Sequence, residues 1–312
     1  MELGIIGLGK MGGNLALQCV NKNIRVVGKT KTPRPDLISA GVNIEEGYGD
    51  FVGALKAPRV IYLSLPAGDT IDKVIDALIP HLDQGDVIMD GGNSYYKDSI
   101  ARERDVTSRG IYYVDCGTSG GLEGARSGAC FMVGGTDEAV RLCEPVLKAL
   151  AVEGGFVHTG KPGSGHFVKL VHNGIEFGML QAIGEGVELM KHGDYHLNLH
   201  DIFRNWSHGS VIRSWLVELM AEGLEEVHDM NAVPSYIEDT GEVNWLVKEA
   251  IDREIPIPVI TQSVIELFRS RQRESDAYRA IAMMRHGFGG HPFGKDESIA
   301  KERKTSKLDQ AA

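Results

Sequence analysis

Four polar side chains, an amine, an imidazole, an amide and a carboxylate, occupy the segment 163–177: Lys169, His172, Asn173 and Glu176. The segment starts with a glycine- and serine-rich loop and continues as a helix, in which Lys169 and Glu176 differ in direction by only about 20°. His172 and Asn173 fall between them on the same side. Such groups exchange protons with a bound molecule or hydrogen-bond to it, and burying them without a polar partner is costly. The pattern predicts either a polar ligand site along this helix face or a structural Lys–Glu pair with a hydrogen-bonded His and Asn.

Composition narrows the function classes. The chain has 312 residues, 42% of them hydrophobic, which is enough for one large core or for two domains. Its formal net charge of -10 gives no support for binding to nucleic acid or to an anionic membrane. No segment approaches the ~18 apolar residues of a membrane span, and no cleavage signal follows Met1. The cysteines are widely spaced, so we expect reduced thiols, no metal site and a cytoplasmic location; they are Cys19, Cys116, Cys130 and Cys143.

A dinucleotide-binding fingerprint opens the chain. Gly7-Leu8-Gly9-Lys10-Met11-Gly12 follows an apolar strand over 3–6 and begins a helix over 11–21, and a second strand follows over 24–28. In this context Gly7 makes a tight turn, Gly9 lets the backbone approach a pyrophosphate and Gly12 brings helix and strand together. We therefore expect a dinucleotide at this loop, including Leu8 and Met11, with its pyrophosphate on the helix N-terminus. The alternative is a glycine-rich turn without a ligand.

The end of the second strand indicates which dinucleotide binds. NAD enzymes usually place a carboxylate there for the ribose hydroxyls, but no acidic residue lies between Glu2 and Asp36. The strand runs instead into Lys29-Thr30-Lys31-Thr32-Pro33-Arg34, and cations and hydroxyls of this kind suit a 2′-phosphate. This predicts NADP, with NAD possible; the alternative is a solvated basic loop.

Three further loops follow predicted strands over 60–65, 87–89 and 112–115. They contain Pro66-Ala67-Gly68-Asp69, Asp90-Gly91-Gly92-Asn93-Ser94 and Cys116-Gly117-Thr118-Ser119-Gly120-Gly121. Ligands of open α/β sheets bind at the carboxyl ends of the strands. Backbone N–H groups, an amide and hydroxyls at that edge suit a carboxylate or polyol, although plain turns would use the same residues.

The pattern of strands ends near residue 160. Strands over 131–133 and 156–158 are the last, and helical periodicity follows over 166–192, 199–206, 211–223, 243–254, 258–273 and 276–284. The sequence thus predicts an α/β Rossmann-like, doubly wound sheet over 1–160 and an all-α substrate and dimerisation domain over 161–294. Residues 295–312 are charged and poor in apolar residues, so we expect a mobile tail there.

Together these motifs resemble the family of decarboxylating 6-phosphogluconate dehydrogenases, in its shorter form, within the β-hydroxyacid dehydrogenase superfamily. The resemblance rests on the fingerprint and on the loops Asp90-Gly91-Gly92-Asn93-Ser94 and Gly117-Thr118-Ser119-Gly120-Gly121. It rests also on Gly165-His166-Phe167-Val168-Lys169-x-Val171-His172-Asn173-Gly174-x-Glu176 and on Arg285-x-x-Phe288-Gly289-Gly290-His291. It implies NADP-dependent oxidation and decarboxylation of 6-phosphogluconate to ribulose 5-phosphate, a step of the pentose phosphate pathway and of gluconate utilisation.

The resemblance also implies roles for individual residues. Lys169 matches the general base that takes the proton from the C3 hydroxyl, and Glu176 matches the acid that protonates C1 after carbon dioxide leaves. The matches to substrate contacts are Asn93, Ser119, Gly120, Gly121, His172, Asn173, Arg285 and His291. The cofactor contacts are Gly7, Leu8, Gly9, Met11, Gly12, Lys29, Thr30, Lys31, Leu65, Pro66 and Asn93. No metal is implied.

The sequence departs from the family at the phosphate end of the substrate. Phe177 stands where the family usually has a tyrosine, Leu267 stands at an arginine position, and 239–245 lacks the Lys-x-Thr element. Arg269 or Arg271 could compensate. The alternatives are a related β-hydroxyacid dehydrogenase acting on another aldonate or short 3-hydroxy acid, and a non-catalytic NADPH-binding scaffold.

The resemblance and the many apolar helix faces predict a homodimer or homotetramer. In such an assembly we expect Arg285 and His291 to reach the substrate of the neighbouring subunit. A tail folded over its own subunit is the alternative.

Overall fold

The computed structural model describes residues 1–305, without the side chains of the last two of these. It divides into two compact units, which comprise Met1–Leu170 and Val171–Arg303. The division lies ten residues beyond the predicted boundary at 160, because the first turn of the long helix α8 (Ser164–Lys191) packs against the sheet of the first unit. A Cβ on Gly165 would lie 2.5 Å from the carbonyl oxygen of Met132.

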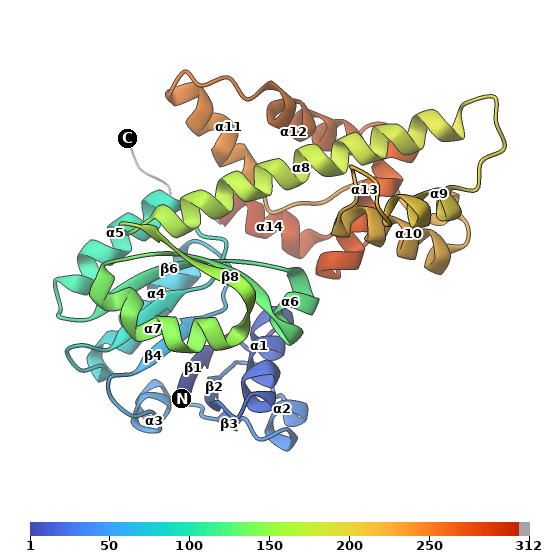
Figure 1. The fold of residues 1–312 in the computed structure, drawn as a ribbon. Helices are drawn as coiled ribbons and strands as arrows, with labels where there is room; N and C mark the ends of the chain where they lie inside the picture. The colour runs from blue at the N-terminus through green and yellow to red at the C-terminus, as the bar shows by residue number, and fades with distance from the viewer. Residues whose placement is uncertain (306–312) are drawn as a thin grey trace. The chain divides into compact units, whose positions relative to one another are not determined.

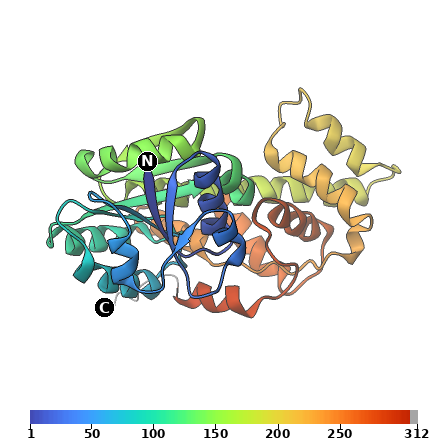
Figure 2. The same cartoon turned by 90° about the horizontal axis from the view of Figure 1, so that it is seen from below.

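The first unit is built on one eight-stranded sheet of order β3-β2-β1-β4-β5-β6-β7-β8 (Figures 1 and 2). Neighbouring strands are parallel except for β6 and β7, which are antiparallel. The strands are β1 (Glu2–Ile6), β2 (Arg25–Lys29), β3 (Asn43–Ile44), β4 (Val60–Leu63), β5 (Val87–Asp90), β6 (Tyr112–Ser119), β7 (Ala129–Gly134) and β8 (Ala151–Gly160). The parallel strands bring their carboxyl ends, and the loops that follow, to one edge of the sheet.

Helices cover both faces of this sheet, which confirms the doubly wound fold. One apolar core includes residues of α1 (Lys10–Asn21), α6 (Gly121–Ser127) and α7 (Asp137–Leu150). The other includes residues of α3 (Tyr48–Gly53), α4 (Asp69–Leu78) and α5 (Tyr96–Thr107). Successive strand residues alternate between the two: Ile5 and Tyr62 belong to the first core, Ile6 and Ile61 to the second. The remaining short elements are α2 (Pro35–Ser39) and the 3₁₀ turn η1 (Ile79–His81).

The regular elements that the structure describes in the second unit are all helices, as predicted. After the carboxyl part of α8 come α9 (Leu199–Trp206), α10 (Trp215–Val227), the 3₁₀ turn η2 (Met230–Ala232), α11 (Glu242–Asp252), α12 (Pro258–Ser270), α13 (Asp276–Gly289) and α14 (Glu297–Thr305). Helix α10 begins four residues later than predicted, at Trp215, because the hydroxyl of Ser214 caps it by accepting from the N–H of Val217. In α10 and α13, Leu219 and Gly287 pack closely: a Cβ on the glycine would lie 2.9 Å from a methyl group of the leucine.

The predicted mobile tail needs correction over 297–305, which form helix α14. Few apolar residues are available to bury this helix, and ion pairs contribute instead: Arg303 bonds to the carboxylates of Glu238 and Asp239. Residues 306–312 of the predicted tail lie outside the described residues. Within the described part of the chain, no helix combines the length and apolarity needed to cross a membrane.

Candidate active site

The glycine loop between β1 and α1 has the conformation that a dinucleotide requires. Gly7 has a φ of +92°, and a Cβ on Gly12 would overlap the carbonyl oxygen of Gly7, so both positions need glycine for internal reasons. Gly9 differs, because a Cβ there would meet nothing within 4 Å. No side chain caps the helix N-terminus at Gly9, and its first turn carries no acidic residue. An open, uncapped helix start fits the pyrophosphate of a dinucleotide.

The basic segment after β2 is already partly engaged. The ammonium of Lys29 bonds to the carbonyl oxygen of Glu46 and lies 4.5 Å from the centre of the Tyr48 ring. Thr30 accepts a hydrogen bond from the N–H of Thr32, and Lys31 is exposed. Arg34, at the end of the same basic run, reaches back with its guanidinium to the carbonyl oxygen of Leu8 in the glycine loop.

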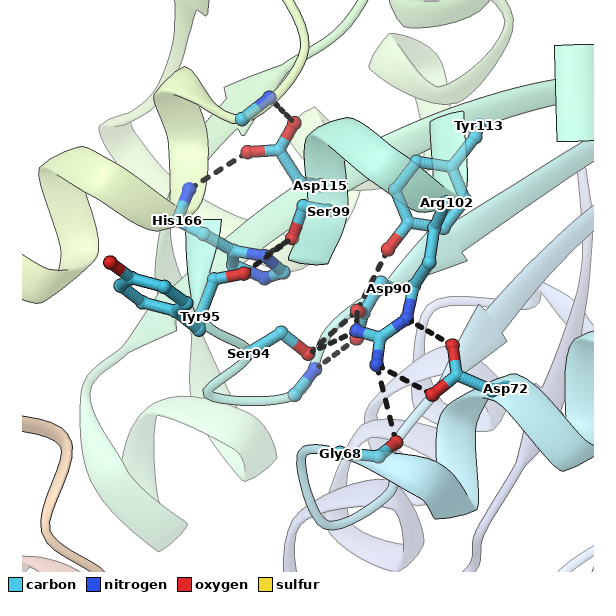
Figure 3. A network of polar contacts seen from close by, with 12 residues as sticks. Gly68, Asp72, Asp90, Ser94, Tyr95, Ser99, Arg102, Tyr113, Asp115 and His166 are labelled. Carbon is cyan, nitrogen blue, oxygen red and sulfur yellow. Dashed lines mark hydrogen bonds and ion pairs between the residues drawn. The ribbon is translucent and has the colours of Figure 1, made fainter. Parts of the chain in front are cut away.

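A buried network fixes the loop that contains Asn93 (Figure 3). Asp90, at the end of β5, is fully buried and accepts hydrogen bonds from the N–H of Gly92, 3.0 Å, and the hydroxyl of Ser94, 2.7 Å. The side chain of Asn93, between these anchors, is exposed. The loop is therefore held from beneath while its amide remains accessible at the edge of the sheet.

Arg102 of α5 balances the charge of Asp90. Its guanidinium lies 3.5 Å from Asp90 and bonds to both carboxylate oxygens of Asp72, at 2.7 and 3.1 Å (Figure 3). Tyr113 donates to Asp90 at 2.9 Å, and burial raises the pKa of this tyrosine, so the hydroxyl stays a donor.

Two predicted cofactor contacts follow β4. Leu65 is half-buried there and Pro66 is exposed.

The predicted loop after residue 115 is partly strand. β6 continues to Ser119, and the chain then turns through Gly120, with φ +117°, into α6. Gly121 also has a positive φ, +59°, so both glycines provide backbone geometry that other residues rarely adopt. Ser119, Gly120 and Gly121 are all half-buried, at the end of the strand next to β5.

Asp115 ties the start of α8 to β6. This fully buried carboxylate accepts hydrogen bonds from the N–H groups of Gly163, 2.6 Å, and His166, 2.8 Å (Figure 3). The Nδ1 atom of His166 lies 2.7 Å from the hydroxyl of Ser99 on α5, where Figure 3 shows the ring facing that serine. Carboxylate acceptors at a helix N-terminus are stabilising, so Asp115 fixes the start of α8 against the middle of β6.

Lys169 lies one turn further along α8 and is only 8% exposed. It packs on Gly117 of β6, where a Cβ would come 2.5 Å from the Cβ of Lys169. The missing side chain of Gly117 thus gives the lysine its place against the strand.

The second-unit part of α8 carries the other predicted polar residues. Nδ1 of His172 lies 3.2 Å from Oδ1 of Asn173 and 4.0 Å from Oε2 of Glu176. Glu176 follows Lys169 by seven residues on the same helix, which is about two turns. All three side chains are half-buried.

The cations predicted for a phosphate have partners in the second unit. Arg285 is buried, donates to the carbonyl oxygen of Glu238 at 2.9 Å and stacks 5.6 Å from the centre of the Phe177 ring. Arg271 pairs with Asp239, and Arg269 lies 2.6 Å from Glu266. His291 packs edge-on against Phe288, with the ring centres 5.7 Å apart.

Sequence reasoning missed the buried groups that hold these loops, chiefly Asp90, Arg102 and Asp115. The two aspartates do have a signal in the sequence, since each directly precedes a glycine-containing polar segment: Asp90 ends β5 before its loop, and Asp115 lies within β6 before Cys116-Gly117-Thr118-Ser119. Arg102 has none in the sequence, because its partners come from two other segments, the start of α4 and the end of β5.

Known proteins match almost the whole chain. Residues 2–160 match the NAD binding domain of 6-phosphogluconate dehydrogenase, and residues 165–311 match the C-terminal domain of 6-phosphogluconate dehydrogenase. The protein YqeC of Bacillus subtilis is 40% identical over 303 residues, covering 95% of this chain and all of YqeC. An NAD(+)-dependent, decarboxylating 6-phosphogluconate dehydrogenase of Haloferax volcanii is 39% identical, again over 95% of this chain and all of that protein.

A solved structure agrees with these matches. The 6-phosphogluconate dehydrogenase of Plasmodium falciparum, studied with NADP+ and with 6-phosphogluconate, superposes with a TM-score of 0.78 at 29% identity. The match covers 87% of this chain and 62% of that longer one. The fingerprint, the polar loops, the lysine-bearing helix and these matches agree: the chain belongs to the 6-phosphogluconate dehydrogenase family of NAD(P)-dependent decarboxylating dehydrogenases.

Proposed function

We propose that the chain catalyses the NADP-dependent oxidative decarboxylation of 6-phosphogluconate to ribulose 5-phosphate and carbon dioxide. The observation that carries this proposal is the buried Lys169, held on Gly117 with Glu176 two turns further along the same helix. A purely reducing or oxidising enzyme needs one proton-transfer group, whereas loss of carbon dioxide leaves an enediol that must be protonated.

Lys169 and Glu176 divide the proton transfers between them. In its neutral form, the amine of Lys169 removes the proton from the C3 hydroxyl as the C3 hydride leaves. The bound nicotinamide supplies the hydride acceptor. The resulting ammonium of Lys169 then polarises the C3 carbonyl, so that the electrons of the breaking C1–C2 bond have an acceptor when carbon dioxide departs. Glu176 protonates the carbon from which carbon dioxide left.

The remaining residues orient the substrate. Asn93, Ser119, Gly120 and Gly121 provide an amide, a hydroxyl and backbone donors at the edge of the sheet for the carboxylate. His172 and Asn173 meet hydroxyl groups along α8. The dinucleotide is held by Gly9 and the N-terminus of α1, with Leu8, Met11, Leu65 and Pro66 beside it and Thr30 and Lys31 at the 2′-phosphate.

The second candidate is an enzyme of the same type that acts on an aldonate without a phosphate, or on a short 3-hydroxy acid. The pairing of Arg271 with Asp239 and of Arg269 with Glu266 favours it, because a phosphate would have to compete with these carboxylates.

One assay separates the candidates. NADPH formation and carbon dioxide release are measured with 6-phosphogluconate, gluconate and 3-hydroxyisobutyrate. We expect kcat/KM to be highest for 6-phosphogluconate, with one carbon dioxide per NADPH. A preference for gluconate would establish the second candidate, and reduced cofactor without carbon dioxide would contradict decarboxylation altogether.

We further propose a cytoplasmic homodimer or homotetramer. Cys19 and Cys143 are buried free thiols, and burial raises the pKa of each to about 12, which keeps them unreactive. On α8, Ile175 and Met179 expose 52% and 41% of their surface one turn apart, an apolar face suited to a second subunit. Light scattering of the purified protein tests the assembly.

A further inference from the structure

Three possible metal ligands converge where the end of α8 meets the start of α13. Glu188 lies in the last turn of α8, His192 is the first residue after that helix, and Asp276 is the first residue of α13. One donor atom from each lies within 4.8 Å of the other two. Nε2 of His192 is 3.5 Å from Oε1 of Glu188 and 3.7 Å from Oδ2 of Asp276.

The other oxygen of each carboxylate is already held in place. Oε2 of Glu188 accepts from the hydroxyl of Ser275, 2.6 Å, and from the N–H of Ala277, 2.7 Å. Oδ1 of Asp276 lies 3.0 Å from the ammonium of Lys191 and 3.3 Å from Arg279. These outer contacts leave Oε1 and Oδ2 turned toward the imidazole, and hydrogen-bonded ligands of this kind are characteristic of metal sites.

The spacing fits a small tetrahedral ion. Zinc binds nitrogen and carboxylate oxygen at about 2.0–2.2 Å, so two neighbouring ligand atoms of a tetrahedron lie about 3.4 Å apart. Both distances from the imidazole are close to this value. One imidazole with two carboxylates is also a ligand set that suits zinc better than magnesium or calcium, which prefer oxygen alone.

We propose that Glu188, His192 and Asp276 form a zinc site, with water as the fourth ligand. The imidazole is exposed, which leaves the ion a path of entry. The zinc site is separate from the proposed active site, because Glu188 follows Glu176 by twelve residues, about 18 Å along the helix. Its effect is to fasten α8 to α13, the helix that carries Arg285.

A protonated His192 lying between the two carboxylates would give the same distances, so the experiment must distinguish a proton from a metal ion. Untagged, chelator-treated protein at pH 7.5 is titrated with zinc chloride by calorimetry, and cobalt(II) is used as a visible-absorption probe. We expect one saturable zinc site per chain, a cobalt spectrum of four-coordinate intensity and a rise of the melting temperature with zinc.

His192→Ala and Asp276→Asn should each weaken zinc binding at least tenfold and abolish the zinc-dependent rise in melting temperature. His200→Ala is the matched control. His200 also has two carboxylate neighbours, but Asp201 lies 3.3 Å from Nδ1 and Glu225 3.8 Å from Nε2, so opposite ring nitrogens face them. That variant should bind zinc like the unmodified chain. No saturable binding to the unmodified chain, or equal affinity in His192→Ala, would overturn the proposal.

Discussion

Gly117 and Lys169 touch where β6 meets α8, with room for the lysine only because residue 117 has no side chain. A Cβ added at 117 would come 2.5 Å from the Cβ of Lys169 and 3.1 Å from the carbonyl oxygen of Gly165. This one steric contact positions Lys169, the proposed base, against β6. A substitution at residue 117 can therefore displace the lysine while leaving its chemical identity unchanged.

Gly117→Ala should lower kcat while leaving cofactor binding nearly unchanged. Displacing a catalytic group by about 1 Å can cost roughly 100-fold in rate, so we expect a loss of about 10- to 100-fold. Steady-state kinetics and NADPH titration measure the two effects. Gly186→Ala is the control, because Gly186 lies on the same helix as Lys169 and an added Cβ would have nothing within 4 Å. This variant should remain active. Equal activity of both variants would contradict the positioning role.

Removing the base itself should separate catalysis from structure. Lys169→Met keeps a long apolar stem, so the protein should fold and bind NADP while turnover falls by about 10²- to 10⁴-fold or more. Glu176→Gln should reduce the full reaction on a similar scale without altering cofactor affinity. If Lys169→Met melts much earlier yet keeps its activity per folded molecule, Lys169 is structural.

The two glycines of the fingerprint should respond differently to alanine. At Gly9 the added methyl enters open space, so stability should be unchanged, while KM for the cofactor rises about tenfold, or ~1.4 kcal/mol. At Gly12 it would overlap the carbonyl oxygen of Gly7, so we expect a loss of roughly 1–3 kcal/mol of stability. Thermal melts and cofactor titrations of both variants test this. Destabilisation by Gly9→Ala would show that this position serves internal packing.

Cofactor preference depends on Thr30 and Lys31. Thr30→Asp should repel a 2′-phosphate and accept hydrogen bonds from ribose hydroxyls, shifting the ratio of kcat/KM from NADP toward NAD by about tenfold or more. The kinetics with NAD provide the internal control, because they should not worsen. Equal use of both cofactors by the unmodified protein would remove the basis for the NADP proposal.

The sequence predicts the sheet well because most of its strands are short, continuous apolar runs, such as 60–63 and 87–89, buried between two helix layers. It predicts the flanking helices less well. Helix α7 has Pro145 in its interior, and α5 buries Asp98 and Arg102 instead of an apolar stripe. Neither pattern predicts a helix from the sequence, although tertiary contacts stabilise both helices.

The glycines of the site can be predicted from the sequence, because each is required by the backbone conformation of its own loop. The groups that anchor the loops are not, because their partners are distant: Asp115 caps a helix 48 residues later, and Ser275 next to Asp276 bonds to Glu188 across 87 residues. For the same reason no metal site is expected from the sequence, in which Glu188, His192 and Asp276 form no motif.

Arg285 provides the test of how subunits share a site. The resemblance predicts that it reaches into the neighbouring subunit, whereas its guanidinium stacks on Phe177 of its own chain, beside Glu176. These two arrangements predict opposite behaviour for a hybrid of Lys169→Met and Arg285→Ala subunits. If each chain completes its own site, every site in the hybrid lacks either the lysine or the arginine.

We expect such hybrids to remain inactive, because Arg285 is buried by contacts within its own chain. The two variants are co-expressed with different tags, hybrids are isolated by sequential affinity steps, and their composition is checked by mass spectrometry. A hybrid of Lys169→Met with an unmodified subunit is the control and should keep about half of the activity. If the hybrid of Lys169→Met and Arg285→Ala subunits instead regains a comparable fraction of the activity, some of its sites combine a native lysine with a native arginine. The arginine must then come from the partner subunit.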